Sequence, residues 1–232
     1  MAQSQTPVSF AEVLNLQALG IQGDAIKFGH CNLESDKCIC VCETFNGQTN
    51  VAIVDLGHGN AVTRKPIGAA ESALLNPSAK IIAIRAQGTL QLLSLEAKAK
   101  LKSHTLPEAH VAFWTWVGPQ TLAVVTPAAV YHWNAEGDSA PQKMFEQLAS
   151  LATGFQIVDY KVSGDGKLCL LSAHQVAGEA AGAGSTVQGA MQLYSVDRKV
   201  SQVLHGHCGA FASVKIPGRS SPAQVLCFED HK

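Results

Sequence analysis

The stretch that decides the fold class reads GTLQLLSLEAKAK, residues 88–100. It begins at a glycine that can turn the backbone, and it continues through alternating and apolar residues that predict a β-strand. Lys98, Lys100 and Lys102 follow at intervals of two residues. Because side chains two apart share one face of an extended backbone, the spacing predicts that all three ammonium groups point to one side.

The same strand pattern recurs along the chain. Four segments can be laid over one another: Ile53–Gly57, Leu92–Glu96, His132–Glu136 and Leu193–Asp197. Measured at their last residues, positions 57, 96, 136 and 197, the successive steps are 39, 40 and 61 residues. A period of about 40 residues, each holding several short strands, is typical of β-propeller blades.

The longer third step coincides with an Ala- and Gly-rich stretch between Val176 and Val187. A phosphate-binding glycine loop would need a following Lys-Ser/Thr or a GxGxxG pattern, and neither is present. We therefore interpret the stretch as a flexible hairpin loop inserted into the repeat.

Turn signals divide the chain into hairpins. Asn46-Gly47, a strong two-residue hairpin signal, separates Cys38–Phe45 from Gln48–Leu56. Further hairpins are expected for Ile81–Ala86 with Thr89–Leu95, Val111–Val117 with Thr121–Thr126 and then Val130–Asn134, and Phe155–Lys161 with Lys167–Ser172. Apart from a short helical or irregular lead-in over residues 11–21, no helix-period segment intervenes, so the pattern predicts an all-β chain of antiparallel sheets.

Composition narrows the functional class. The chain has 232 residues, 47% of them hydrophobic and 15% charged, with a net charge of −1, which argues against disorder and against a broad nucleic-acid-binding surface. No apolar run reaches the roughly 18 residues needed to span a bilayer, and the first residues lack the basic and apolar regions of a secretory leader. Seven cysteines without a framework spacing are consistent with reduced, cytosolic thiols.

The residues that could carry chemistry favour structural roles. Cys38, Cys40 and Cys42 alternate along one strand face, whereas a tetrahedral zinc site wants a turn between paired ligands, so small buried side chains are expected. The run 205–208 (HGHC) could be a metal-binding cluster, but a Gly-His pair is also common after the last strand of a propeller blade. Trp114, Trp116 and Trp133 are expected in the core between blades. No catalytic motif or close carboxylate pair is present, so we expect no catalytic residues, no metal and no cofactor.

A second interpretation is open for the cationic residues. Lys98, Lys100 and Lys102, with Arg64 and Lys65 one repeat earlier, would by default form a solvated face. They also lie beside an apolar strand edge. An apolar groove rimmed by cations suits an extended peptide with hydrophobic anchors and an acidic end.

The chain resembles the N-terminal domain of the clathrin heavy chain family, from Met1 to about Phe228. The most specific segment is GAMQLYSVDRKVSQ, residues 189–202. Shorter collinear matches are Glu34–Lys37, Asn76-Pro77, His104-Thr105, Val130–Trp133 and Lys143–Phe145.

The resemblance implies a seven-bladed propeller of WD40-like blades that binds short linear motifs of adaptor proteins. The groove between the first two blades would take the acidic-hydrophobic clathrin box. Its lining maps onto Ile53, Thr63, Arg64, Lys65, Ile82, Thr89, Gln91, Leu93, Lys98 and Lys100. Thr63 stands where the family usually has Ile, Leu93 where it has Phe, and Lys65 where it has Arg, which loses the planar fork.

Two further sites follow from the same resemblance. A central pocket would use Phe28, Gln156 and Val158. A third groove, between the fourth and fifth blades, would use Leu193, Arg198, Val200, Gln202 and Phe228.

At about 40 residues a blade, residues 1–232 would hold about five of the seven blades, so we expect a partial N-terminal propeller domain whose last edge strand is unpaired. The implied partners are adaptors carrying clathrin boxes and, in a full-length chain, other clathrin heavy and light chains. Membrane contact would come through adaptors only, and the implied location is cytoplasmic, on coated pits and vesicles. Two alternatives remain: a structural coat fragment that binds no adaptor, and a propeller hydrolase, which would need clustered carboxylates.

Overall fold

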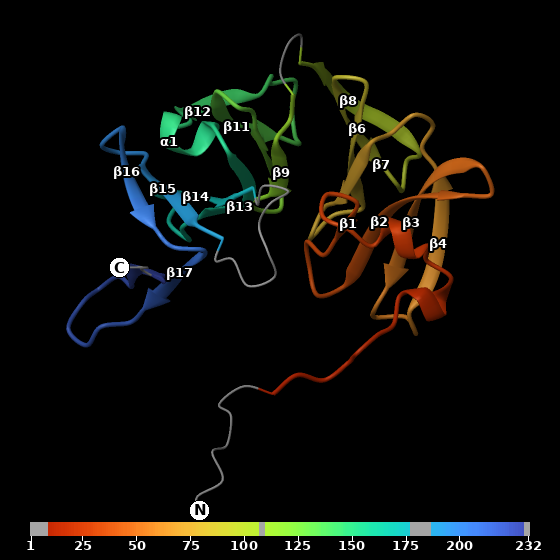
Figure 1. Ribbon diagram of the computed structural model, residues 1–232, viewed down its shortest axis with the longest axis horizontal. Helices are drawn as coiled ribbons and strands as arrows, with labels where there is room; N and C mark the ends of the chain where they lie inside the picture. Colours follow the sequence, from red (N-terminus) through yellow and green to blue (C-terminus); the bar gives the residue numbers. More distant parts are fainter. Residues whose placement is uncertain (1–8, 107–109, 177–186, 230–232) are drawn as a thin grey trace, which may run out of the picture.

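A computed structural model of the chain describes residues 9–106, 110–176 and 187–229. In these ranges, antiparallel strands form four four-stranded sheets and one two-stranded sheet. Figure 1 shows the sheets following one another in chain order around an arc, from orange through yellow and green to blue. We call the four-stranded sheets the first to fourth blades.

The strand bounds show one repeating plan. The first blade is β1 (Cys31–Asn32), β2 (Cys38–Phe45), β3 (Gln48–Asp55) and β4 (Ala61–Pro66). The second is β5 (Ser72–Leu75), β6 (Ile81–Ala86), β7 (Thr89–Ser94) and β8 (Ala99–Thr105). The third is β9 (Phe113–Trp116), β10 (Thr121–Val125), β11 (Ala129–Asn134) and β12 (Gln142–Glu146). The fourth is β13 (Phe155–Val162), β14 (Leu168–Gln175), β15 (Gly189–Ser195) and β16 (Val200–His205), and the pair β17 (Gly209–Val214) and β18 (Ala223–Phe228) follows.

Helical structure is confined to three short elements in the described part of the chain. They are η1 (Gln17–Leu19), η2 (Gly23–Ala25) and α1 (Ala149–Ala152). The expected short lead-in before the first blade is therefore confirmed. None of the helices in the described ranges is long and apolar enough to cross a membrane.

Each blade is a meander in which every strand pairs with its neighbour in sequence. The four repeated segments identified in the sequence fall on the third strand of each blade, at β3, β7, β11 and β15 and the turns after them. This order of four antiparallel strands per repeat confirms the all-β propeller class. The number of blades, about five of seven, stays a prediction.

The tight hairpin turns are also confirmed. Between β2 and β3, Asn46 has φ 51° and Gly47 has φ 75°; between β6 and β7, Gln87 has φ 48° and Gly88 has φ 72°. Positive φ at both central residues is the type I′ geometry, whose twist matches that of paired strands. Of the predicted insertion between Val176 and Val187, residues 177–186 lie outside the described ranges, while its flanks pair through Gln175 N–H and the Gln188 carbonyl at 2.8 Å.

The core lies between the blades rather than within one layer. Leu90 and Leu92 of β7 pack with Trp114, Trp116 and Trp133 between the second and third blades. The opposite face of the second blade packs on the first blade. The alternation of strand side chains explains this, because each blade buries one face against each neighbour. The predicted core role of the three tryptophans is confirmed.

The cysteines of β2 are partly as predicted. Cys40 and Cys42 are buried, while Cys38 is only half-buried. The Cys40 and Cys42 thiols point to the Ala73 and Ala70 carbonyls at 3.7 and 3.9 Å. Burial raises the pKa of the Cys40 thiol to about 12, so it is protonated and unreactive at neutral pH.

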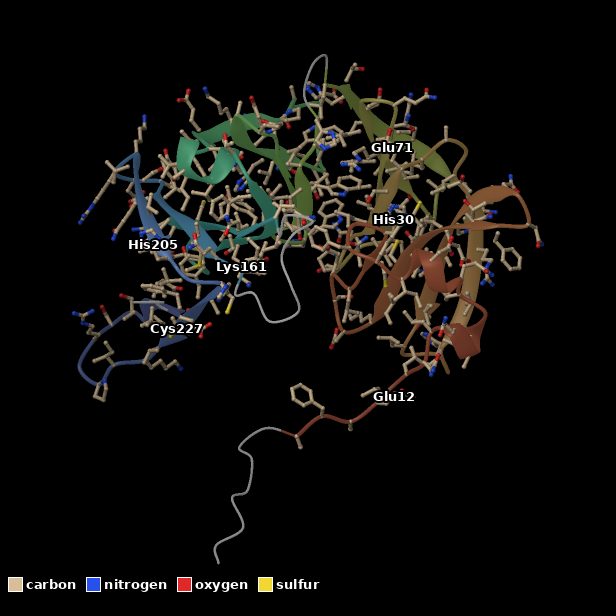
Figure 2. All side chains as sticks on the ribbon, in the orientation of Figure 1. Glu12, His30, Glu71, Lys161, His205 and Cys227 are labelled. Carbon is tan, nitrogen blue, oxygen red and sulfur yellow. The ribbon has the colours of Figure 1, made fainter. Side chains whose placement is uncertain are left out.

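Lys161 on β13 connects the last pair of strands to the fourth blade. Its ammonium group pairs with Asp159 and donates to the Gly209 carbonyl, at 3.2 Å, at the start of β17. Figure 2 shows Lys161 between the fourth blade and this hairpin. The contact continues the blade-to-blade arrangement beyond the four complete sheets.

Candidate functional site: grooves between and on the blades

A groove follows the seam between the first and second blades. It consists of two hollows of about 210 Å³ and about 560 Å³, which we call the smaller and the larger hollow. Lys65 of β4 and Leu95, directly after β7, line both of them. These two residues therefore mark the point where the hollows adjoin.

The smaller hollow has an apolar floor and a cationic rim. Val51, Ile82, Ile84 and Leu93 are among its lining residues, and all four belong to the core between the first two blades. Lys65, Lys98 and Lys100 supply the charge. In this part of the groove, no lining residue is an acid. Apolar anchors and an anionic end are the ligand features that such a surface complements.

Strand register explains which predicted residues meet here. Leu93 of β7 lies opposite Ile82 of β6, and Lys100 of β8 lies opposite Leu93. Ile53 and Thr63 are likewise partners, on β3 and β4, and both line the larger hollow. Seven of the ten predicted groove residues line one hollow or the other: Ile53, Thr63, Lys65, Ile82, Leu93, Lys98 and Lys100. Thr89 and Gln91 share the face of Leu93 by alternation but line neither hollow.

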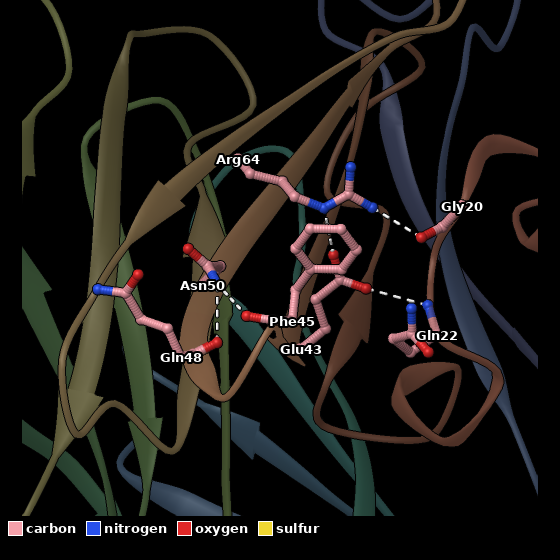
Figure 3. A network of polar contacts seen from close by, with 7 residues as sticks. All are labelled: Gly20, Gln22, Glu43, Phe45, Gln48, Asn50 and Arg64. Atoms are coloured by element: carbon pink, nitrogen blue, oxygen red, sulfur yellow. Dashed lines mark hydrogen bonds and ion pairs between the residues drawn. The ribbon is translucent and has the colours of Figure 1, made fainter.

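Arg64 lies on the other face of β4 from Lys65. Its Nε donates to Glu43 Oε1 at 2.8 Å, a guanidinium nitrogen donates to the Gly20 carbonyl at 2.7 Å, and the guanidinium lies 4.4 Å from the Phe45 ring centroid. Glu43 also accepts from the Gln22 amide at 3.0 Å (Figure 3). Arg64 thus fixes the segment before β1 against the first blade, and the structure does not bring it to the groove.

Lys102 does not share a side with Lys98 and Lys100, so that expectation is wrong. A register shift between Leu92 and Leu93 inserts one residue into β8, which places Lys102 opposite Leu92 rather than on the face of Leu93. Its ammonium group reaches the third blade, where it donates to the carbonyls of Asn134 and Gly137 at 2.6 and 2.8 Å. A β-bulge of this kind redirects the side chains that follow it.

The predicted central pocket is only partly described by contacts. Phe28, 55% exposed, stacks on Phe113 of β9 with centroids 6.1 Å apart and an interplanar angle of 17°. Gln156 is exposed and Val158 is half-buried, both on β13. The pocket stays a prediction.

The predicted third groove is represented by a hollow of about 390 Å³ on the fourth blade. Leu193, Arg198, Val200 and Gln202 all line it. Phe228 is not in its lining; it lies on β18, opposite Gly209. Four of the five residues predicted for this groove, from the neighbouring strands β15 and β16 and the turn between them, therefore line one hollow, and the groove itself stays a prediction.

Comparison with known proteins identifies homologues of this chain. The chain matches no family model. Clathrin heavy chain 2 of Homo sapiens is 47% identical over 225 residues, which cover 96% of this chain, and clathrin heavy chain 1 of Arabidopsis thaliana is 44% identical over 234 residues, which cover 98%. This chain is a homologue of the clathrin heavy chains. It spans about 13% of the length of these relatives.

A solved β-propeller domain, Cps50 (Swd1) of Myceliophteria thermophila, is similar at 8% identity and a TM-score of 0.49, covering 75% of this chain and 58% of that one. The propeller assignment for the clathrin homologue rests instead on its own repeated meanders.

Sequence reasoning missed several lining residues of the first groove in this clathrin homologue. Those outside the predicted set are chiefly in the larger hollow: Ser35, Lys37, Cys38, Asp55, Gly57, His58, Leu75–Lys80 and Leu95. Asn76-Pro77-Ser78 is a turn signal between two strands, which could have indicated a loop at the end of the groove. Which loops meet across two blades depends on tertiary packing, and no local pattern carries that information.

Three buried or half-buried titratable groups outside the hollows make structural contacts. His132 Nε2 and the Tyr160 hydroxyl lie 2.8 Å apart in the interior, and burial lowers the pKa of His132 to about 4 while it raises that of Tyr160. Glu34 accepts from the Thr115 hydroxyl and the Trp116 amide, both at 3.0 Å, and burial raises its pKa. Among the described residues, no group of three or more His, Cys, Asp or Glu side chains could hold a metal ion.

Proposed function

We propose that this chain is a non-enzymatic module of a clathrin coat, which binds extended peptide segments of adaptor proteins in the groove between its first two blades. The observation that carries the proposal is the smaller hollow, where an apolar floor of Ile82 and Leu93 is rimmed by Lys65, Lys98 and Lys100. A segment of the type Leu-φ-x-φ-Asp/Glu, with φ a bulky apolar residue, complements both features. Homology to clathrin heavy chains supports the coat assignment.

The apolar contacts must supply most of the affinity. An exposed Lys–carboxylate pair contributes about 0.2–1 kcal/mol, whereas fully burying one leucine side chain contributes about 1.5–3 kcal/mol. Leu93 and Thr63 present less apolar surface than the Phe and Ile usual in the family at these positions. We therefore expect a dissociation constant on the order of micromolar or weaker.

Two further sites belong to the same proposal. The hollow on the fourth blade combines Leu193 and Val200 with polar residues of both charges, Arg198 and Asp197 among them, which suits a second peptide with apolar anchors and polar groups. A central site at Phe28, Gln156 and Val158 is proposed from the family resemblance alone. Within a longer chain, the partners would include other clathrin heavy and light chains. The site of action would be the cytoplasmic face of coated pits and vesicles in endocytosis and protein sorting, with adaptors as the link to the membrane.

Titration of a fluorescently labelled clathrin-box peptide tests the function directly. The 232-residue chain should bind the box peptide and not a scrambled peptide of equal composition. Leu93→Ala should weaken binding, while Leu33→Ala, which truncates an exposed leucine outside both hollows, should not. Equal binding of box and scrambled peptides, or none, would favour the alternative of a coat fragment that binds no adaptor.

A further inference from the structure

We propose that the larger hollow of the first groove binds a negatively charged side chain, an aspartate, a glutamate or a phosphorylated serine or threonine, on the amino-terminal flank of the bound peptide. The inference rests on the proposed function, because one extended peptide would occupy both hollows. It adds a charge requirement outside the box motif and assigns it chiefly to Lys37 and Lys80, which line the larger hollow and not the smaller one.

Cations converge on this hollow from three separate segments. Lys37 comes from the loop between β1 and β2, Lys65 from β4, and Lys80 from the loop between β5 and β6. They line one space of about 560 Å³, which can admit a side chain as large as a phosphoserine. Three ammonium groups around one concave surface create a positive potential that attracts an anion.

One carboxylate inside the hollow offsets part of this charge, but three lysines against it leave the lining net positive, and local donors already occupy its oxygens. Asp55 also lines the hollow, but its carboxylate accepts from His58 Nδ1 at 2.9 Å and from the Gly57 amide at 3.0 Å. The hydrogen bond from His58 lowers the pKa of Asp55. Lys80 pairs with Glu96 at 3.4 Å, yet these side chains are 74% and 70% exposed, so a ligand anion can displace the pair at little cost.

The wall that carries Lys80 is fixed before any ligand binds. Asn76 is buried, and its Oδ1 accepts from the Ser78 and Ala79 amides at 2.9 and 2.8 Å. Its Nδ2 donates to the Pro119 carbonyl of the third blade at 2.8 Å. The loop is thus held from within and from the neighbouring blade, which reduces the entropy lost when a ligand orders it.

The order of the hollows sets the direction of the peptide. Its acidic end would face Lys98 and Lys100 in the smaller hollow, and Lys65 and Leu95 join that hollow to the larger one. An extended chain advances about 3.3 Å per residue. Residues before the first leucine of the box therefore enter the larger hollow, where Ile53, with Leu95, supplies an apolar wall.

Three labelled peptides separate the possibilities by fluorescence anisotropy at low salt. The first is the box flanked by neutral residues, the second has phosphoserine two residues before its first leucine, and the third has phosphoserine two residues after its acid. Glutamate versions of the second and third distinguish a carboxylate from a phosphate. For the 232-residue chain we expect the amino-terminal phosphoserine to tighten binding about two- to fivefold, the range of one or two exposed ion pairs.

The double variant Lys37→Gln/Lys80→Gln should lose this gain while binding the neutral box peptide as wild type does. Lys143→Gln, an exposed lysine of the third blade, is the matched control and should keep the gain. If no peptide binds wild type, the proposed function fails and the inference with it. If the box binds but the flank adds nothing, if the gain survives in the double variant, or if only the carboxyl-terminal phosphoserine helps, the inference alone is overturned.

Discussion

Replacing Arg64 with methionine should destabilise the fold far more than the same change at Lys65, its neighbour in sequence. The Glu43 side chain is 0% exposed and depends on Arg64 Nε, 2.8 Å away, for its ion pair. Methionine retains much of the aliphatic stem but removes the charge. Among the described residues, the buried Glu43 carboxylate is then left with the Gln22 amide alone, at 3.0 Å.

The magnitude follows from burial. Removing one partner of a fully buried pair costs about 3–5 kcal/mol, but Arg64 is 24% exposed and the Gln22 hydrogen bond remains, so about 2–3 kcal/mol applies here. Loss of the guanidinium over Phe45, 4.4 Å from its ring centroid, adds about 0.5–1 kcal/mol. We expect the free energy of unfolding to fall by about 3 kcal/mol and Tm by about 6–12 °C, at about 2–4 °C per kcal/mol for a chain of this size.

Urea unfolding followed by tryptophan fluorescence measures the loss, since all three tryptophans lie in one blade-to-blade core. Lys65→Met should change stability by less than about 0.5 kcal/mol but should weaken binding of the box peptide. Adding Glu43→Gln to Arg64→Met should recover part of the loss, because the uncompensated charge is gone. Equal stability of the Arg64 and Lys65 variants would refute the assignment of Arg64 to the fold.

Three other results are expected. Leu93→Ala should weaken box-peptide binding more than Lys100→Ala, and only the Lys100 change should flatten its salt dependence in titrations at two salt concentrations. Burial lowers the pKa of His132 to about 4, so below pH 6.5 the unfolded chain binds a proton at this residue that the folded chain does not bind. The free energy of unfolding should therefore fall by up to about 3 kcal/mol as pH drops from 6.5 to 4. Urea titrations should show a smaller pH dependence for His132→Gln. Gln192→Leu should cost about 2–4 kcal/mol in the same assay, because the buried amide bonds the Glu146 carbonyl and the Leu148 amide, both at 2.9 Å.

The parts of the fold that could be predicted are those with local causes. Asn46-Gly47 and Gln87-Gly88 adopt positive φ within two residues, and the strands on either side begin and end at the predicted residues to within one position. The repeat at the third strands was visible because each of those strands is followed by a similar turn. The packing of Trp133 followed from its apolar strand context, and it is 1% exposed.

The faces presented by individual strands were harder to predict. Lys98, Lys100 and Lys102 have the spacing of one face, but the extra residue that enters β8 between Lys100 and Lys102 sends Lys102 to the third blade. A bulge depends on how two strands fit in three dimensions, and the sequence spacing is the same with or without it. The larger hollow was missed for the same kind of reason, because its walls come from loops of two different blades.

The contrast between Arg64 and Lys65 shows how the groove depends on residues outside it. Consecutive residues of a strand point to opposite faces, so both cannot line one groove on β4. Val51 lies opposite Lys65 and belongs to the seam with the second blade, whereas Ala52 lies opposite Arg64 and packs toward the segment before β1. The resemblance to clathrin places both Arg64 and Lys65 at the binding site, whereas in the structure the two side chains lie on opposite faces of β4. Arg64 holds β4 in place from behind, and that position presents Lys65 where the two hollows adjoin, so a variant at Arg64 would reduce peptide binding only through loss of folded protein.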